Sequence, residues 1–291
     1  MKFLIAAMAI ASVPLTGGVI ESSRMPVGSK WVVHMDLDAI RASEPGKALL
    51  ARIERDEGPR LKALKRITSL NPLQDLRSIT LSGDGLPDHA VIMIDGEFDR
   101  EHLLDLVKAA EGYSENQRNG LLVHSWLDHG IAQHASFLTP QLLAFSRQEE
   151  SFSDTLTGRA QARAPLDWHL PEISDRPLIA ATASLGEMTL PGDTSQIVRL
   201  ISRLSFAVQQ DSDGLSVRVA AECKDAAKAE VLRRMLDGVL AVVEIEHPEL
   251  TELGLRSKVQ STPNAPGVLC VLSMPNAGWC QLMESRSAIK K

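Results

Sequence analysis

The stretch Ala90-Val-Ile-Met-Ile-Asp-Gly-Glu-Phe-Asp-Arg-Glu-His-Leu-Leu-Asp-Leu-Val-Lys-Ala109 decides the fold class. Its first residues are apolar on both faces of an extended chain, which predicts a central strand, and Asp99 can cap the amphipathic helix that follows. A second stretch of this kind, Leu215-Ser-Val-Arg-Val-Ala-Ala-Glu-Cys-Lys-Asp-Ala-Ala-Lys-Ala-Glu-Val-Leu-Arg-Arg-Met-Leu236, lies further along the chain. The pair predicts two copies of one α+β unit.

The segments around these stretches are consistent with sheets that carry helices. Residues 31–38 alternate between apolar and polar side chains, which predicts a half-buried strand with Trp31, Val33 and Met35 toward the core. Ser43 can cap a helix, which Gly58-Pro59 is expected to interrupt. The predicted fold class is therefore α+β: two tandem repeats, each a mostly antiparallel sheet with helices packed on one face.

The chain divides into four expected segments. Residues 1–18 have one lysine, a short apolar run and then small residues, which is typical of a signal peptide; an uncleaved anchor is the alternative. Residues 24–157 form the first repeat, 158–176 a proline-containing linker, and 177–291 the second repeat. We therefore expect a periplasmic or secreted protein with no transmembrane segment beyond the signal peptide.

Composition argues against nucleic acid as a partner and permits one disulfide bond. The chain has 291 residues and a net charge of -6, and no cluster of Lys and Arg stands out, which argues against nucleic acid. Its three cysteines all lie in the second half. Export would permit a disulfide between Cys270 and Cys280, and the alternative is that both are buried thiols.

A histidine-rich hairpin is the first candidate for a binding site. If Leu127 pairs with Ile131 around the turn between them, His124 lies opposite His134, with Trp126 on the same face. His34 and Asp36 could join them from the first strand. Such a face could bind a metal ion or a polar ligand, but an antiparallel sheet with one ordinary solvated face explains the same residues.

An acid/base group is the second candidate. His34 shares a strand face with Asp36 and Asp38, and a carboxylate beside a histidine tunes its protonation. No nucleophile is marked, and the usual catalytic motifs are absent from the sequence, so no catalytic residue and no cofactor are assigned. On the corresponding strand of the second repeat, Ser216, Arg218 and Glu222 are expected on the open face.

Three short segments carry a resemblance to a known group. They are residues 32–38 (Val-Val-His-Met-Asp-Leu-Asp), 98–101 (Phe-Asp-Arg-Glu) and 124–126 (His-Ser-Trp). With them, most of residues 31–157 resembles a group of exported bacterial proteins of uncharacterised function. The resemblance implies export and an α+β fold, and it implies no activity.

These observations favour a non-catalytic binding or interaction module that takes a protein or a small polar ligand on its open sheet faces. Two alternatives stay open. One is a metal-dependent or acid/base hydrolase, which would need His34, His124 and His134 to converge with carboxylates in a pocket. The other is a structural protein of the cell envelope, which an exposed apolar patch would favour.

Overall fold

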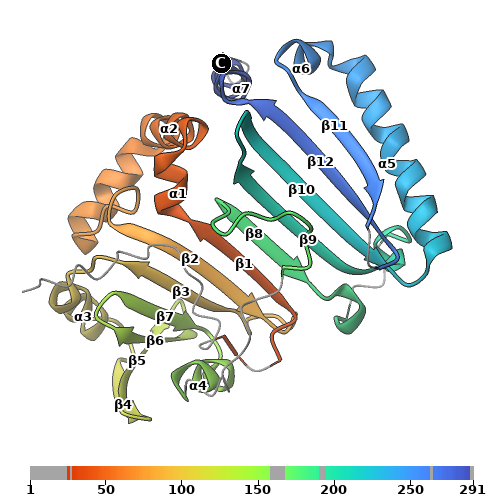
Figure 1. Ribbon diagram of the computed structural model, residues 1–291. Helices are drawn as coiled ribbons and strands as arrows, with labels where there is room; N and C mark the ends of the chain where they lie inside the picture. The colour runs from red at the N-terminus through yellow and green to blue at the C-terminus, as the bar shows by residue number, and fades with distance from the viewer. Residues whose placement is uncertain (1–24, 27, 158–167, 190–194, 263–264, 289–291) are drawn as a thin grey trace, which may run out of the picture.

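The protein is built on one antiparallel sheet of 12 strands, seen in the computed structural model in Figure 1. The structure describes residues 25–26, 28–157, 168–189, 195–262 and 265–288, so the predicted signal peptide lies outside the described residues. The strand order is β11-β12-β10-β9-β8-β1-β2-β3-β7-β6-β5-β4. Helices pack against this sheet, which confirms the α+β class.

The first half of the chain supplies seven of the strands. Its elements are β1 (Trp31–Asp36), α1 (Leu37–Ala42), α2 (Glu44–Thr68), β2 (Leu76–Gly83), β3 (Val91–Gly96), α3 (Arg100–Lys108), β4 (Ser114–Arg118), β5 (Leu121–Asp128), β6 (Ile131–Thr139), β7 (Leu142–Ser146) and α4 (Glu149–Thr157). The stretch that begins at Ala90 forms β3 and α3, and the Asp99 carboxylate accepts a hydrogen bond from the His102 backbone as the helix cap.

The second half supplies the other five strands. Its elements are β8 (Ile179–Ala183), two short turns of 3₁₀ helix (Leu185–Glu187 and Val198–Leu200), β9 (Ile201–Gln210), β10 (Gly214–Cys223), α5 (Ala226–Glu246), α6 (Pro248–Glu252), β11 (Arg256–Ser261), β12 (Gly267–Pro275) and α7 (Asn276–Ala288). The stretch that begins at Leu215 forms β10 and α5, as predicted.

The two halves meet at the pair β1–β8, in which His34 lies opposite Ala180. Outward from this pair the order is β1, β2, β3, β7 and β6 on one side, and β8, β9, β10, β12 and β11 on the other. Five strands of each half therefore follow the same order, and the first half adds β5 and β4 at its outer edge. This agreement is consistent with a duplication, which stays a prediction, and the sheets of the halves are fused into one.

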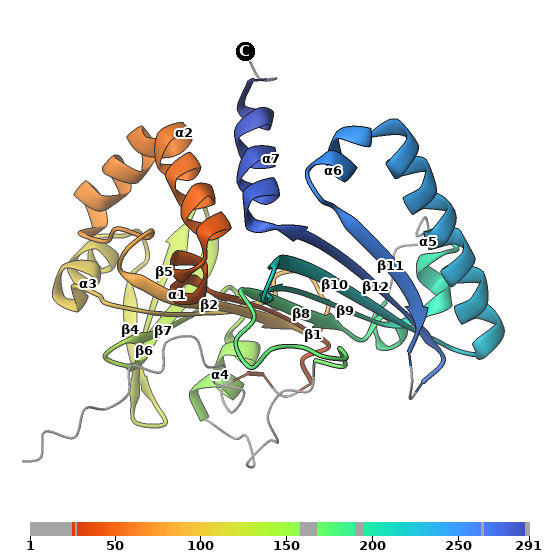
Figure 2. The same ribbon diagram turned by 45° about the horizontal axis from the view of Figure 1, so that its top comes forward.

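The helices are divided unequally between the two faces of the sheet. Figure 2 shows α2, α3, α5 and α7 above the sheet and α4 below it. We call the face that carries α2, α3, α5 and α7 the helix face. The opposite one, covered by α4 and by residues 168–178, is the linker face. Of these five helices, α4 departs from the expected placement of helices on a single face.

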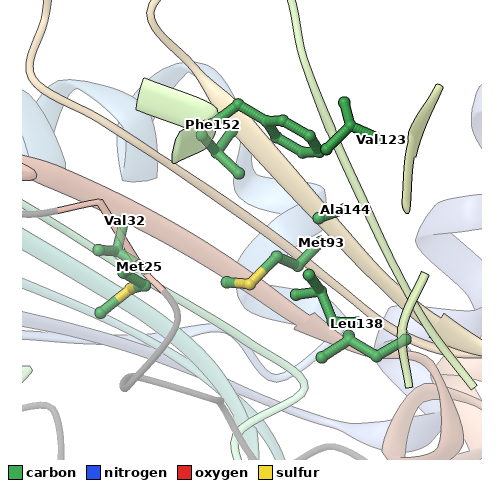
Figure 3. Packing of buried hydrophobic residues seen from close by; sticks show 9 residues of the cluster. Met25, Val32, Met93, Val123, Leu138, Ala144 and Phe152 are labelled. Atoms are coloured by element: carbon green, nitrogen blue, oxygen red, sulfur yellow. The ribbon is translucent and has the colours of Figure 1, made fainter. Parts of the chain in front are cut away.

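The linker face holds two apolar clusters. The first, shown in Figure 3, packs Phe152 of α4 against the sheet; its buried members are Met25, Val32, Val91, Met93, Val123, Leu138, Leu142, Ala144 and Phe152. In the second, Leu170 packs on the small side chains Ala180, Ala207 and Ala220 and on Leu269. Trp168 packs against both clusters, so part of the segment expected to be a linker belongs to the core.

The predicted orientation of β1 is wrong. His34 and Asp36 are 3% and 1% exposed, whereas Trp31, Val33 and Met35 are only half-buried. The alternation was correctly predicted, but the polar side of the strand is the one that residues 168–178 cover. A pattern of alternating residues shows that a strand has two faces and does not show which of them a distant segment will bury.

Two helix predictions are also corrected. Helix α2 runs without interruption through Pro59, which is exposed, so water can satisfy the carbonyl group that loses its backbone partner. The helix expected near residues 197–201 is only a single 3₁₀ turn, because β9 already begins at Ile201.

Candidate functional site

The predicted histidine pair does not form. Asp128 pairs with Ile131, so the turn of the hairpin contains only His129 and Gly130, whose φ angles are 50° and 79°. Two positive φ angles are the signature of the tight turn that suits a two-residue hairpin. The register therefore shifts by one residue from the expected one, and His124 lies opposite Ala135. Such a shift moves a side chain to the other face.

His124 and His134 consequently lie on opposite faces of the sheet. The His134 ring stacks on Phe152 at 6.4 Å on the linker face, and its Nδ1 lies 2.9 Å from Ser125 Oγ. His124 faces α3 on the helix face, beside Trp126. No face therefore gathers the four predicted metal ligands.

The side chains of His34 and Asp36 are buried on the linker face and make hydrogen bonds there. His34 Nδ1 lies 2.9 Å from Thr80 Oγ1 of the neighbouring strand. The Asp36 carboxylate accepts a hydrogen bond from the Ala39 backbone at 2.8 Å, which caps α1, and it also accepts from Arg176 at 2.7 and 3.1 Å. These contacts explain the burial of both residues as structural.

The described part of the chain has no group of side chains placed to hold a metal ion and no disulfide bond. There, no group of three or more His, Cys, Asp or Glu side chains is placed to hold a metal ion. The three cysteines are free, so Cys270 and Cys280 are not bonded in this structure. Burial raises the pKa of the Cys223 and Cys270 thiols, which keeps them protonated and poorly nucleophilic near neutral pH.

A hydrogen-bonded chain fixes the His124 ring. The Tyr113 hydroxyl donates to Glu115 Oε2 at 2.8 Å and lies 3.0 Å from His124 Nδ1. Burial and the bond to Glu115 raise the pKa of Tyr113 to about 12, so the hydroxyl keeps its only proton. That proton serves Glu115, and His124 Nδ1–H must therefore donate to the Tyr113 oxygen. Burial lowers the pKa of His124, which favours the neutral ring.

An apolar cavity of about 270 Å³ lies between α3 and strands β5–β7, on the helix face. His124 and Trp126 line it, and Trp126 also contacts Phe145, whose ring centroid is 6.1 Å away. The remaining lining side chains are mostly aliphatic or aromatic: Thr68, Leu103, Leu104, Leu106, Val107, Ala135, Ser136, Phe137, Leu143 and Phe145. This wall has the composition of a site for an apolar ligand.

The helix face also presents half-buried apolar side chains at the middle of the sheet. One row crosses five strands through directly paired residues: Leu81, Val33, Ala181, Phe206 and Val219. The strands that carry the row, β2, β1, β8, β9 and β10, run below the space between α2 and α5 in Figure 2, where α7 also stands. Apolar side chains left half-open in a continuous row are uncommon unless they contact a ligand or a partner.

Helix α5 carries a second, exposed apolar stripe. Ala229 and Leu232 are buried against the sheet, whereas the helix exposes Val231, Met235, Val239, Val242 and Ile245. Glu244 accepts a hydrogen bond from Ser257 on the edge strand β11, so that flank of the helix faces the edge of the sheet. At 100° per residue, Val242 lies on the opposite flank, which faces the middle of the sheet.

A larger and more polar cleft of about 680 Å³ lies where the halves meet, between the start of α2 and the start of α7. Asp38 and Arg176 line it. Each is already paired, Asp38 with Arg41 and Arg176 with the buried Asp36. The cleft therefore offers less free charge to a ligand than its lining residues suggest.

One of these features has a signal in the sequence. Asn119-Gly120 has φ angles of 50° and 80° and forms the turn between β4 and β5. Asn-Gly is the strongest short hairpin signal, and it predicts the all-polar strand β4. The cavity under α3 has no comparable signal, because it depends on how α3 docks against three strands.

Comparisons with known proteins show a likeness of fold. No family model matches the chain, and no curated protein matches it. Among solved structures, crystal form III of TP0453 aligns with a TM-score of 0.50 and 7% identity, covering 90% of this chain and 97% of that one. Crystal form IV of TP0453 gives a TM-score of 0.49 at 7% identity, with 92% and 97% covered. At this identity the likeness concerns the fold alone.

No helix among the described residues is long and apolar enough to cross a membrane. This is consistent with the expectation of no transmembrane segment beyond the predicted signal peptide.

Proposed function

We propose that this is an exported, non-catalytic binding protein that takes a small apolar ligand in the cavity under α3. The observation that carries the proposal is the cavity wall, which is built almost entirely from aliphatic and aromatic side chains. The single titratable side chain in that wall, His124, is held neutral by burial and is fixed by Tyr113. Export rests on the apolar segment at the start of the chain.

The chemistry of the wall revises the class of ligand. The sequence favoured a polar ligand on an open face, because His124 and Trp126 were expected beside His134. With His134 on the other face, the side chains that remain around His124 and Trp126 are apolar. Desolvating a polar ligand there would cost free energy that few partners in the wall could repay. An aliphatic chain or ring system fits this wall better.

Titration calorimetry with decanol tests the proposal. Ala135→Leu fills the cavity from β6, and we expect it to weaken decanol binding by roughly tenfold or more. Ala181→Leu makes the same change in the half-open row at the middle of the sheet and is the matched control. Leu106→Arg, at a position 37% exposed on α3, charges the wall without overfilling the core.

The three variants separate the outcomes. Loss of binding in Ala135→Leu and Leu106→Arg, with binding kept in Ala181→Leu, supports the cavity. Loss in Ala181→Leu alone would move the ligand to the middle of the sheet, and no binding to the wild-type protein would reject the proposal. Melting temperatures of all variants show whether each has folded.

A second candidate, a structural subunit that assembles with copies of itself, is favoured by the exposed stripe on α5. Val239 and Val242 are 59% and 53% exposed there. If the stripe forms contacts between copies, sedimentation of the wild-type protein will show a concentration-dependent oligomer. Val239→Lys/Val242→Lys should then return it to a monomer, and a wild-type monomer at all concentrations would reject this candidate.

A further inference from the structure

Three cationic side chains meet on the linker face at the far end of the second half. Arg218 on β10 lies opposite Val271 on β12, and Lys258 on the edge strand β11 lies opposite the same Val271. Two pairs further along, Arg256 of β11 lies opposite Ser273. Residues that face each other across an antiparallel sheet, and those two apart on one strand, project from the same face. All three cations therefore project from the linker face.

A cavity of about 370 Å³ opens among these three side chains. Glu172, from the segment that covers the linker face, is the one acidic residue in its lining. Ser273 and Gln260 add polar groups. The lining thus carries three positive charges and one negative charge, in a protein whose overall charge is -6. A local excess of positive charge against the net charge of the chain concentrates anions.

Most of this positive charge is unpaired. Arg218 donates from Nη1 to Glu172 Oε2 at 2.9 Å, and the Glu172 side chain is 74% exposed. For Arg256 and Lys258, both exposed, the described part of the chain provides no ion-pair or hydrogen-bond partner. A ligand could therefore be bound by two cations that give up no existing contact.

One residue in the lining of this cavity, Arg218, has an unsatisfied buried group. Among the described residues, four buried side-chain atoms have no hydrogen-bond partner, and three of them belong to Ser174, Ser216 and Arg218. Arg218 is the most direct case, since its side chain is only 11% exposed and its Nε donates to nothing. Gln209 lies next to both serines. It is paired with Ser216 across the sheet, and its side-chain oxygen accepts a hydrogen bond from the Ser174 backbone N–H. A buried donor without an acceptor is costly.

We propose that this cavity binds an oxyanion of the phosphate class, free or carried on a small molecule. Arginine offers a planar set of donors that matches the oxygens of such an anion, and among the described residues Glu172 accepts from only the Nη1 donor of Arg218. Arg256 and Lys258 add two exposed positive charges to the lining of the cavity. The volume exceeds that of a bare ion, which leaves room for a small attached group. This site lies on the opposite face from the apolar cavity, so it does not depend on the function proposed above.

Titration calorimetry at low ionic strength, with inorganic phosphate and with glycerol phosphate as the two probes, tests the proposal. Arg256→Gln/Lys258→Gln removes two exposed charges, and we expect it to weaken binding by roughly fivefold or more. Glu172→Gln removes the competing carboxylate and should tighten binding by roughly twofold to fivefold. Lys62→Gln/Arg66→Gln removes two exposed charges from α2 and is the matched control.

The outcomes are distinct. Opposite shifts in the two site variants, with no change in the control, support the site. Tighter binding of glycerol phosphate than of phosphate assigns the ligand to the esterified class, and the reverse assigns it to the free ion. No binding by the wild-type protein, or an equal loss in the control variant, would overturn the proposal. The substitutions at residues 256 and 258 change exposed side chains, so loss of folding is not the expected cause of weaker binding.

Discussion

Single residues on the linker face stabilise the junction between the halves. The buried Asp36 carboxylate caps α1 and accepts two hydrogen bonds from Arg176 of the second half. We expect Asp36→Ala to lower the free energy of unfolding by about 2–4 kcal/mol, since it removes a helix cap and charged hydrogen bonds. Urea unfolding followed by circular dichroism measures this. Asp38→Ala is the control, because its more exposed pair with Arg41 should contribute less than about 1 kcal/mol. Equal losses would contradict this role for Asp36.

Two histidines whose pKa is lowered by burial, the buried His124 and the half-buried His134, predict how stability depends on pH. Burial lowers the pKa of His124 and of His134 below 6.5, the ordinary value for this side chain. The unfolded chain therefore binds more protons than the folded one just below that pH, so stability is lost as the pH falls through 6.5 toward the lowered values. Urea midpoints between about pH 7 and about pH 5.5 should decrease.

The two histidines can be tested directly. His124→Gln/His134→Gln should flatten the dependence on pH, and His129→Gln, at a side chain that is 95% exposed, should leave it unchanged. A slope that survives in the double variant would show that other groups cause it.

At the scale of elements, α5 has an apolar flank that packs and an apolar flank that does not. Leu232 is 4% exposed and Val239 is 59% exposed on the same helix. We expect Leu232→Ala to cost about 2–4 kcal/mol through lost burial and a residual cavity, and Val239→Ala to cost less than about 0.5 kcal/mol. Chemical unfolding of both variants makes the comparison. A large loss in Val239→Ala would mean that a partner or second copy covers the exposed flank in solution.

The elements also show how far the sequence could predict this structure. The strand, turn and helix at Asp99 and the long helix from Asp225 follow from local periodicity and capping, and both are found where expected. The faces of β1 could not be predicted, because residues 168–178 decide which side is buried. The prediction of the candidate site was wrong because of a difference of one residue in the length of a turn. A two-residue turn at His129-Gly130, in place of a three-residue one, separated His124 from His134.

The whole molecule should unfold as one cooperative unit. Its sheet is continuous through β1 and β8, and Trp168 packs against the apolar clusters of both halves. Scanning calorimetry is expected to show one transition in which the calorimetric and van't Hoff enthalpies agree. Trp168→Ala, which removes a large shared side chain, should lower the melting temperature and broaden that transition. Two separate transitions in the wild-type protein would show that the halves are independent domains.

The β1–β8 pairing has a consequence for the order in which the chain is made. Strand β1 is synthesised early, yet one of its two neighbours belongs to the second half. Until β8 emerges, β1 has an open hydrogen-bonding edge, and the cover supplied by residues 168–178 is also missing. Exposed edges of this kind recruit other chains. The first half is thus most prone to pair with other chains before β8 has been made.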